Sequence, residues 1–284
     1  MAAPYSPSVR RRRLSAELKR LRTESGMTLV EAAKRAGMGK SNLSKIEQAE
    51  SKTVPAPTLN KLLDLYEVRD STVRRAMHEL SKLAGQKGWW SSYKDVMPQI
   101  LADFEAEACA IRTFEPQLVP GLLQTPAYAD AVFRANRVRD DAEISQRVAA
   151  RMARQTILNR VDPPTYLAII DEAALHRTVG SPAVMREQLR HLTHLAARHN
   201  IDIYVLPFSA GAHTSTEGSY LIMDFPDPRD SSIVYLEGPA TTMYLEEDHQ
   251  IRAFNAMFGS TQSCSMTPVQ TLETLKHLIQ DLEE

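Results

Sequence analysis

A stretch of twenty residues near the N-terminus, 29–48, has the residue spacing of two short helices that cross through a tight turn. Ala33 stands where two helices that cross at about 90–120° come closest, so a methyl side chain fits there. Gly37 stands where the turn needs a residue with positive φ. Leu43 and Ile46, three apart on the second helix, are expected to bury one of its faces. The pattern predicts a helix-turn-helix unit.

The second helix of this unit is expected to turn a polar face outward. That face carries Lys40, Ser41, Asn42, Ser44 and Lys45. Amide and hydroxyl groups can hydrogen-bond to base edges in the major groove, and lysine can bind either guanine or phosphate. We therefore expect the helix at 40–48 to contact double-stranded DNA. A helical protein-interaction domain of the same fold is the alternative, which a net positive charge disfavours.

Charge divides the chain into two parts. Residues 1–90 contain 18 Lys and Arg against 9 Asp and Glu, whereas residues 91–284 contain 16 against 26. A chain of 284 residues suits two domains, and a basic one joined to an acidic one indicates a polyanion partner for the first only. Gly85 and Gly88 flank a short polar segment. We expect a DNA-binding domain at 1–84, a linker at 85–91 and a second domain at 92–284.

The rest of the composition limits where the protein works. No run of eighteen apolar residues and no cleavable hydrophobic leader is apparent, so a cytoplasmic protein without a membrane partner is expected. Cys109 and Cys264 are expected to be free thiols. His191 and His194 share a helix face but have no third ligand, so no metal site is expected. No cofactor is expected either.

The N-terminal part is expected to be an all-α domain of five helices. Leu14, Leu18 and Leu21 recur at i, i+4 and i+7, which predicts a helix over about 9–25, ended by Gly26. Thr28, followed three residues later by a glutamate, predicts a capping box for the next helix. After the recognition helix, two further apolar periodicities predict one helix from about 58 and another through 73–80.

The segment GMTLVEAAKRAGMGKSNLSKIE, together with its flanking helices, resembles the Xre/phage-repressor family of helix-turn-helix proteins over residues 8–83. The resemblance implies a structural pair in which Arg22 of the first helix binds Glu47. The family commonly places glutamine at the start of its second helix, where it helps to bind the phosphate backbone. This chain has Leu29 there, which puts that contact in doubt.

Four consecutive arginines, Arg10, Arg11, Arg12 and Arg13, precede the first apolar positions. They fit a basic arm that neutralises phosphate or enters the minor groove. They fit equally well a solvated first helical turn that aids solubility. Cations oppose the macrodipole at a helix N-terminus, which suggests another use for them.

The second domain is expected to be a mixed α/β fold. Helices are predicted near 93–106, from Thr125, and over 141–159, 182–199, 246–259 and 268–283. Strands are predicted over ACAIRTFE, TYLAIID, IDIYVLP, GSYLIMDF and SIVYLE. Alternating helices and strands favour a mixed sheet with helices packed on it.

The segments GWWSSY, FEPQLVPGLLQTPAYADAVFRA and VLPFSAGAHTSTEGSYLIMDF resemble the C-terminal domain of bacterial Xre-type regulators described as antitoxin-like or WhiJ-like, over nearly all of 88–280. The resemblance implies a transcription regulator whose second domain has no established catalytic role. It also implies a small partner protein that is often encoded beside it.

The loop PFSAGAHTSTEGSY holds a group of polar side chains before a strand, where α/β domains can form pockets. His213, Glu217 and Tyr220 are the candidate effector or partner surface. With Ser215 they also suggest a catalytic triad, but no GxSxG elbow is present and triad members usually come from separate elements. We expect no catalytic residues here.

Together these features predict a homodimeric, sequence-specific transcription regulator whose second domain binds a small protein partner or a small-molecule effector. One alternative is an antitoxin-like protein that neutralises a small partner and represses its own operon. Another is an enzyme whose α/β domain acts on a nucleotide or acyl substrate and whose DNA-binding domain is autoregulatory.

Overall fold

A computed structural model describes residues 9–85, 89–136, 138, 140–227, 230–238 and 241–283, without the side chains of Trp89 and Trp90. The chain divides into two compact units between these two tryptophans. Part of the expected linker, 86–88, lies outside the described residues. Each unit is described by itself.

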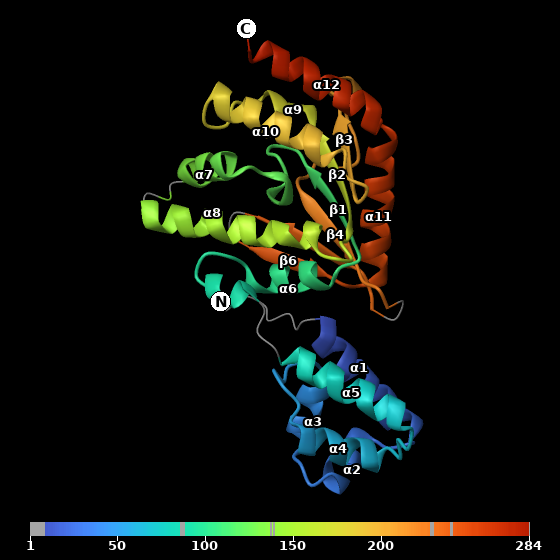
Figure 1. Ribbon diagram of the computed structural model, residues 1–284. Helices are drawn as coiled ribbons and strands as arrows, with labels where there is room; N and C mark the ends of the chain where they lie inside the picture. The colour runs from blue at the N-terminus through green and yellow to red at the C-terminus, as the bar shows by residue number, and fades with distance from the viewer. Residues whose placement is uncertain are drawn as a thin grey trace. The chain divides into compact units, whose positions relative to one another are not determined.

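The N-terminal unit contains five helices and no strand among its described residues (Figure 1). They are α1 (Val9–Glu24), α2 (Leu29–Arg35), α3 (Lys40–Glu47), α4 (Ala56–Leu65) and α5 (Ser71–Ala84). The expected all-α domain of five helices is confirmed.

The turns of this unit follow from the residues that the sequence places there. Gly26 and Gly37 adopt positive φ, 72° and 66°, which a side chain would strain. The Thr28 hydroxyl accepts a hydrogen bond from the Glu31 amide, and the Glu31 carboxylate accepts one from the Thr28 amide at 2.9 Å. Ala33 is buried in the core. The capping box therefore fixes where α2 begins, and the glycine turn and the buried Ala33 let α2 pack against α3.

The C-terminal unit is built on a six-stranded sheet with the order β3-β2-β1-β4-β5-β6. Its strands are β1 (Ala110–Glu115), β2 (Thr165–Asp171), β3 (Ile201–Leu206), β4 (Tyr220–Asp224), β5 (Ile233–Glu237) and β6 (Thr242–Leu245). β1, β2 and β3 are mutually parallel, whereas β4 to β6 form an antiparallel meander that joins β1. The expected mixed sheet is confirmed.

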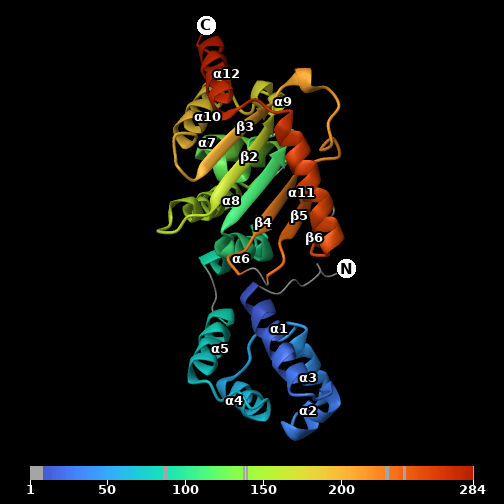
Figure 2. The same ribbon diagram turned by 90° about the vertical axis from the view of Figure 1, so that its right-hand side faces the viewer.

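Helices cover both faces of the sheet (Figures 1 and 2). They are α6 (Gln99–Glu107), α7 (Pro126–Ala135), α8 (Asp141–Gln155), α9 (Glu172–His176), α10 (Pro182–Leu195), α11 (Asp248–Ser263) and α12 (Pro268–Asp281). α6, α7, α8 and α10 lie on one face, and α11 lies on the other (Figure 1). None of the helices in the described part of the chain combines the length and apolar composition that a membrane crossing needs.

Several details differ from the expected elements. The helix expected near 93–106 begins only at Gln99, and the short helix α9 was not expected. The helix expected over 141–159 ends at Gln155 and continues as a 3₁₀ turn, Thr156–Asn159. The helix expected over 182–199 ends at Leu195. Strand β6 was not expected, because four residues, TMYL, are too short to show an alternation between polar and apolar positions.

Candidate DNA-binding surface and C-terminal pockets

Helix α3 presents a polar face to solvent. Lys40, Ser41, Asn42 and Lys45 are exposed, and Ser44 is half-buried. On the opposite side, Leu43 is fully buried and Ile46 is 7% exposed. The burial of these two residues fixes the rotation of α3, so the polar side chains project away from the domain core.

Arg22 of α1 and Glu47 of α3 form a bidentate ion pair. Arg22 Nε lies 2.7 Å from Glu47 Oε1, and Nη2 lies 2.9 Å from Oε2. Nη1 also donates to the Met27 carbonyl oxygen at 2.7 Å. The hydrogen bonds that Arg22 donates to the Glu47 carboxylate raise the pKa of Arg22 above its usual value. One guanidinium thus joins α1, the turn before α2 and the end of α3.

The remaining N-terminal candidates lie on helices other than α3. Arg10, Arg11, Arg12 and Arg13 lie in the first two turns of α1, where each is half-buried. They are therefore part of the helix and not of an extended arm. Leu29 is half-buried and packs on the hydrophobic core, so its side chain cannot replace the hydrogen bonds of a glutamine.

In the C-terminal loop, the structure brings Ser215 and Tyr220 together. Ser215 is 1% exposed, and its Oγ lies 2.8 Å from Tyr220 Oη and 2.6 Å from Oγ1 of Thr261 on α11. His213 accepts a hydrogen bond from the Ser215 backbone amide at 3.2 Å and packs its ring on Phe114. A catalytic triad requires a hydrogen bond between the serine hydroxyl and the imidazole. Here the Ser215 hydroxyl is instead hydrogen-bonded to two other hydroxyls.

A pocket of about 240 Å³ lies beside this loop, on the α11 face of the sheet. We call it the meander pocket. Its lining includes Tyr220 of β4, Leu236 of β5 and Met243 of β6, with Phe254 and Met257 of α11. Glu217 and Tyr220 line it, whereas His213 does not. Two of the three residues expected to form an effector surface therefore share a pocket.

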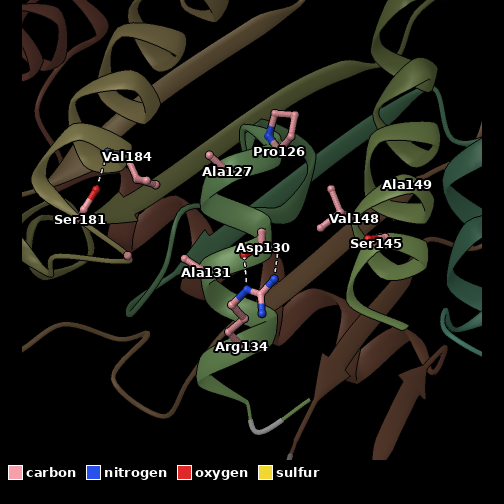
Figure 3. A pocket seen from close by; sticks show the side chains of 11 residues that line it. Pro126, Ala127, Asp130, Ala131, Arg134, Ser145, Val148, Ala149, Ser181 and Val184 are labelled. Carbon is pink, nitrogen blue, oxygen red and sulfur yellow. Dashed lines mark hydrogen bonds and ion pairs between the residues drawn. The ribbon is translucent and has the colours of Figure 1, made fainter. Parts of the chain in front are cut away.

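A larger, open groove of about 840 Å³ lies between α7, α8 and the start of α10 (Figure 3). Ala127, Ala131, Val148 and Val184 are among the mostly apolar residues that line it. An Asp130–Arg134 ion pair, 2.7 Å between Oδ2 and Nε, lies on its α7 side. The alanines of α7 gave no separate signal in the sequence, because small residues are equally common on helix faces that pack internally.

A buried ion pair lies on the α8 face of the sheet, far from any motif of the sequence. Glu105 of α6 is fully buried, and its carboxylate receives two hydrogen bonds from Arg154 of α8, at 2.6 and 2.9 Å. Burial raises the pKa of Glu105, although Arg154 opposes this effect. Burial would lower the pKa of Arg154, but the Glu105 carboxylate keeps it above its usual value.

Two further charged groups lie near this pair. Burial and the nearby Glu237 carboxylate raise the pKa of Glu115, at the end of β1, to about 7. Burial and the neighbouring Arg154 lower the pKa of Arg151 to about 10. The sequence held one signal for this cluster, since Arg147, Arg151 and Arg154 recur at i, i+4 and i+7 on a single helix face.

The other candidates from the sequence stand apart from these sites. His191 and His194 lie on α10, and burial lowers the pKa of His191. Within the described ranges, no group of three or more His, Cys, Asp or Glu side chains is placed to hold a metal ion. Cys109 and Cys264 are exposed free thiols.

Comparison with known families covers both units. The family model described as "Domain of unknown function (DUF5753)" matches residues 99–277, and a model described as "Helix-turn-helix domain" matches residues 13–77. The first match spans more than half of the chain. The chain belongs to the DUF5753 family. No curated protein and no solved structure matches it.

The two matches fall on the two units. The helix-turn-helix match includes α3 and both members of the Arg22–Glu47 pair, so the N-terminal domain is a helix-turn-helix domain and the protein is a DNA-binding regulator. The DUF5753 domain includes the sheet, the meander pocket, the groove and the Glu105–Arg154 pair. The description of that domain assigns it no activity.

Proposed function

We propose that the protein is a sequence-specific transcription regulator of the Xre type. It binds DNA as a homodimer through α3, and its DUF5753 domain dimerises and receives a signal from a small molecule or a partner protein. The observation that carries the proposal is the exposed polar face of α3, Lys40 to Lys45, on a basic helix-turn-helix domain.

The division of labour between the domains is tested with fragments. We expect residues 1–84 alone to bind DNA weakly and residues 88–284 alone not to bind it, because residues 1–90 hold an excess of 9 positive charges and the remainder an excess of 10 negative charges. Fluorescence anisotropy with a labelled duplex at moderate salt measures both. Retention of DNA by residues 88–284 would contradict the proposal.

A homodimer is expected because one recognition helix covers only a few base pairs. Paired helix-turn-helix domains bind half-sites about 34–36 Å apart, or a multiple of that distance. The larger apolar side chains of α3 and α4 are mostly used in the core of their own domain. Dimer contacts are therefore assigned to the DUF5753 domain. Sedimentation velocity should show a dimer at micromolar concentration, and a monomer there would contradict this assignment.

Sequence reading is assigned to Asn42, which is exposed in the first turn of α3. Asn42→Ala should weaken binding to the cognate operator by about 1–3 kcal/mol and change binding to a scrambled duplex little, because a contact with a base edge discriminates between sequences. Equal losses on both duplexes would exclude α3 as the reading helix.

The matched variant replaces Arg10, Arg11, Arg12 and Arg13 with glutamine, which retains helix propensity. It should weaken binding to both duplexes. Each lost phosphate contact should reduce the slope of log K against log salt by about 0.9. Titrations at several salt concentrations distinguish this nonspecific loss from the loss of reading in Asn42→Ala.

A second candidate function is that of an antitoxin-like protein, which the apolar groove between α7 and α8 favours because it is open enough for a protein segment. Co-purification of a small protein from the native host, abolished by Ala131→Arg in the groove, would support this candidate.

We propose no catalysis by the DUF5753 domain, since the Ser215 hydroxyl is hydrogen-bonded to the hydroxyls of Tyr220 and Thr261 and not to an imidazole. Turnover of a nucleotide or acyl ester by the purified protein would instead support the alternative that the α/β domain is an enzyme.

A further inference from the structure

The meander pocket is formed by one transverse row of the sheet. Leu236 of β5 pairs with Met243 of β6. On β4, Leu221 pairs with Tyr235, so the preceding residue, Tyr220, is level with Leu236 and extends the row. Phe254 and Met257 of α11 face this row from the helix side. A single aromatic ring needs about 150 Å³ of apolar space. The pocket, at about 240 Å³, is therefore large enough for one ring and a short chain.

The wall of the pocket is held in place by hydroxyl groups. Thr214 donates to the Met257 carbonyl oxygen at 3.1 Å, and the Ser215 hydroxyl joins Tyr220 to Thr261. These bonds tie the loop that carries Glu217 to α11. The loop that bounds the pocket is therefore held against α11 by side-chain hydrogen bonds.

The chemistry of the lining favours a cation. Among the described residues that line the pocket, none is Lys, Arg or His. Two are aromatic and two are methionines, which are polarisable groups that attract ammonium ions or aromatic rings. The exposed carboxylate of Glu217 is a hydrogen-bond acceptor for a charged donor.

Glu237, the other acidic residue of the lining, has its side chain on the opposite face of the sheet. Side chains alternate along a strand, so Glu237 points away from the face that Leu236 shares with Met243. Its carboxylate acts instead on Glu115, whose pKa it raises. Glu217 is therefore the one acidic side chain of the described lining that can meet a ligand there.

We propose that the meander pocket binds a small organic cation, an ammonium group on a compact aryl or alkyl body, with the body between Tyr220, Phe254 and the methionines and the ammonium donating to Glu217. That such a cation acts as the signal rests on the proposed function, in which the DUF5753 domain binds an effector. It is tested without DNA, so failure of DNA binding and failure of ligand binding are separate results.

The test uses three probes that share a 2-phenylethyl body on the full-length protein. 2-Phenylethylammonium, 2-phenylethanol and 3-phenylpropionate carry a positive, a zero and a negative charge on similar bodies. Isothermal titration calorimetry should give the ammonium probe about tenfold higher affinity than the alcohol, because two attractions add: that of the exposed Glu217 carboxylate and that of the Tyr220 and Phe254 rings. The carboxylate should bind most weakly. Equal affinities, or no binding by any probe, would overturn the proposal.

Three variants locate the binding. Glu217→Gln should bring the ammonium probe to within about threefold of the alcohol without abolishing binding of the alcohol. Glu237→Gln, the matched control, should retain the tenfold preference. Met243→Trp should fill the pocket from its edge and abolish binding of all probes; Met243 is 46% exposed, so the change does not disturb the core. Thermal melts check folding, and an unchanged preference in Glu217→Gln overturns the assignment.

Discussion

Arg154→Ala should destabilise the DUF5753 domain by about 3–5 kcal/mol. The substitution leaves the Glu105 carboxylate, which is fully buried, without either of the hydrogen bonds that Arg154 donates to it. A buried carboxylate without a cation must either remain charged in a medium that solvates it poorly or take up a proton. Urea denaturation followed by circular dichroism measures the loss.

The matched control is Arg147→Ala on the same helix. Arg147 pairs with Glu143, and the side chains of the two are 29% and 40% exposed, so this change should cost about 1 kcal/mol or less. Replacing both buried partners, Glu105→Leu with Arg154→Met, should cost less than Arg154→Ala alone, because no uncompensated charge remains. If Arg154→Ala and Arg147→Ala lost similar amounts of unfolding free energy, burial of the Glu105–Arg154 pair would not be the cause of the loss.

The loss in Arg154→Ala should also depend on pH. Burial raises the pKa of Glu105 in the native protein, and removal of the guanidinium raises it further. A carboxyl whose folded pKa exceeds its unfolded value, about 4.3, stabilises the protein fully below that value and loses this contribution as pH rises through the folded pKa. The variant should therefore be closest to the wild type in acid. A difference that grows on acidification would contradict this sign.

The helix-turn-helix could be predicted from the sequence because its constraints are local. Gly37 has the positive φ that its place in the turn requires, Thr28 and Glu31 form the capping box, and Leu43 and Ile46 are buried. Each of these residues answers a steric or hydrogen-bonding need within a few positions along the chain. The same reasoning gave the strands of the mixed sheet, except for the short β6.

The C-terminal sites could not be predicted because their residues come from distant parts of the chain. Glu105 and Arg154 are 49 positions apart, and neither belongs to a motif. The loop with Glu217 and Tyr220 is visible in the sequence as a polar cluster, but the hydrogen bond between its Ser215 hydroxyl and Thr261 of α11 joins residues 46 positions apart. Met243, which lines the meander pocket, lies on the strand that was missed. Which of these distant residues come together depends on how the strands pair and on which helices pack on the sheet.

Arg22→Ala should destabilise the N-terminal domain by about 3–5 kcal/mol and abolish its DNA binding. The side chains of Arg22 and Glu47 are only 12% and 4% exposed, so the substitution leaves a nearly buried carboxylate without its cation. It also removes the donor to the Met27 carbonyl oxygen. Because a single hydrophobic core in a domain of this size rarely supplies more than about 3–5 kcal/mol, a loss of this size unfolds a large share of the molecules.

Arg20→Ala on the same helix is the control for this prediction. Arg20 forms ion pairs with Glu17 and Glu24, but its side chain is 46% exposed, so its removal should cost about 1 kcal/mol or less and leave DNA binding intact. Denaturation of the full-length protein should show the loss in Arg22→Ala in the N-terminal transition only, because Arg22 lies in the N-terminal unit. If Arg22→Ala lost no more stability than Arg20→Ala, the ion pair would not be what holds α3 in its reading position, and the packing of Leu43 and Ile46 alone would have to do so.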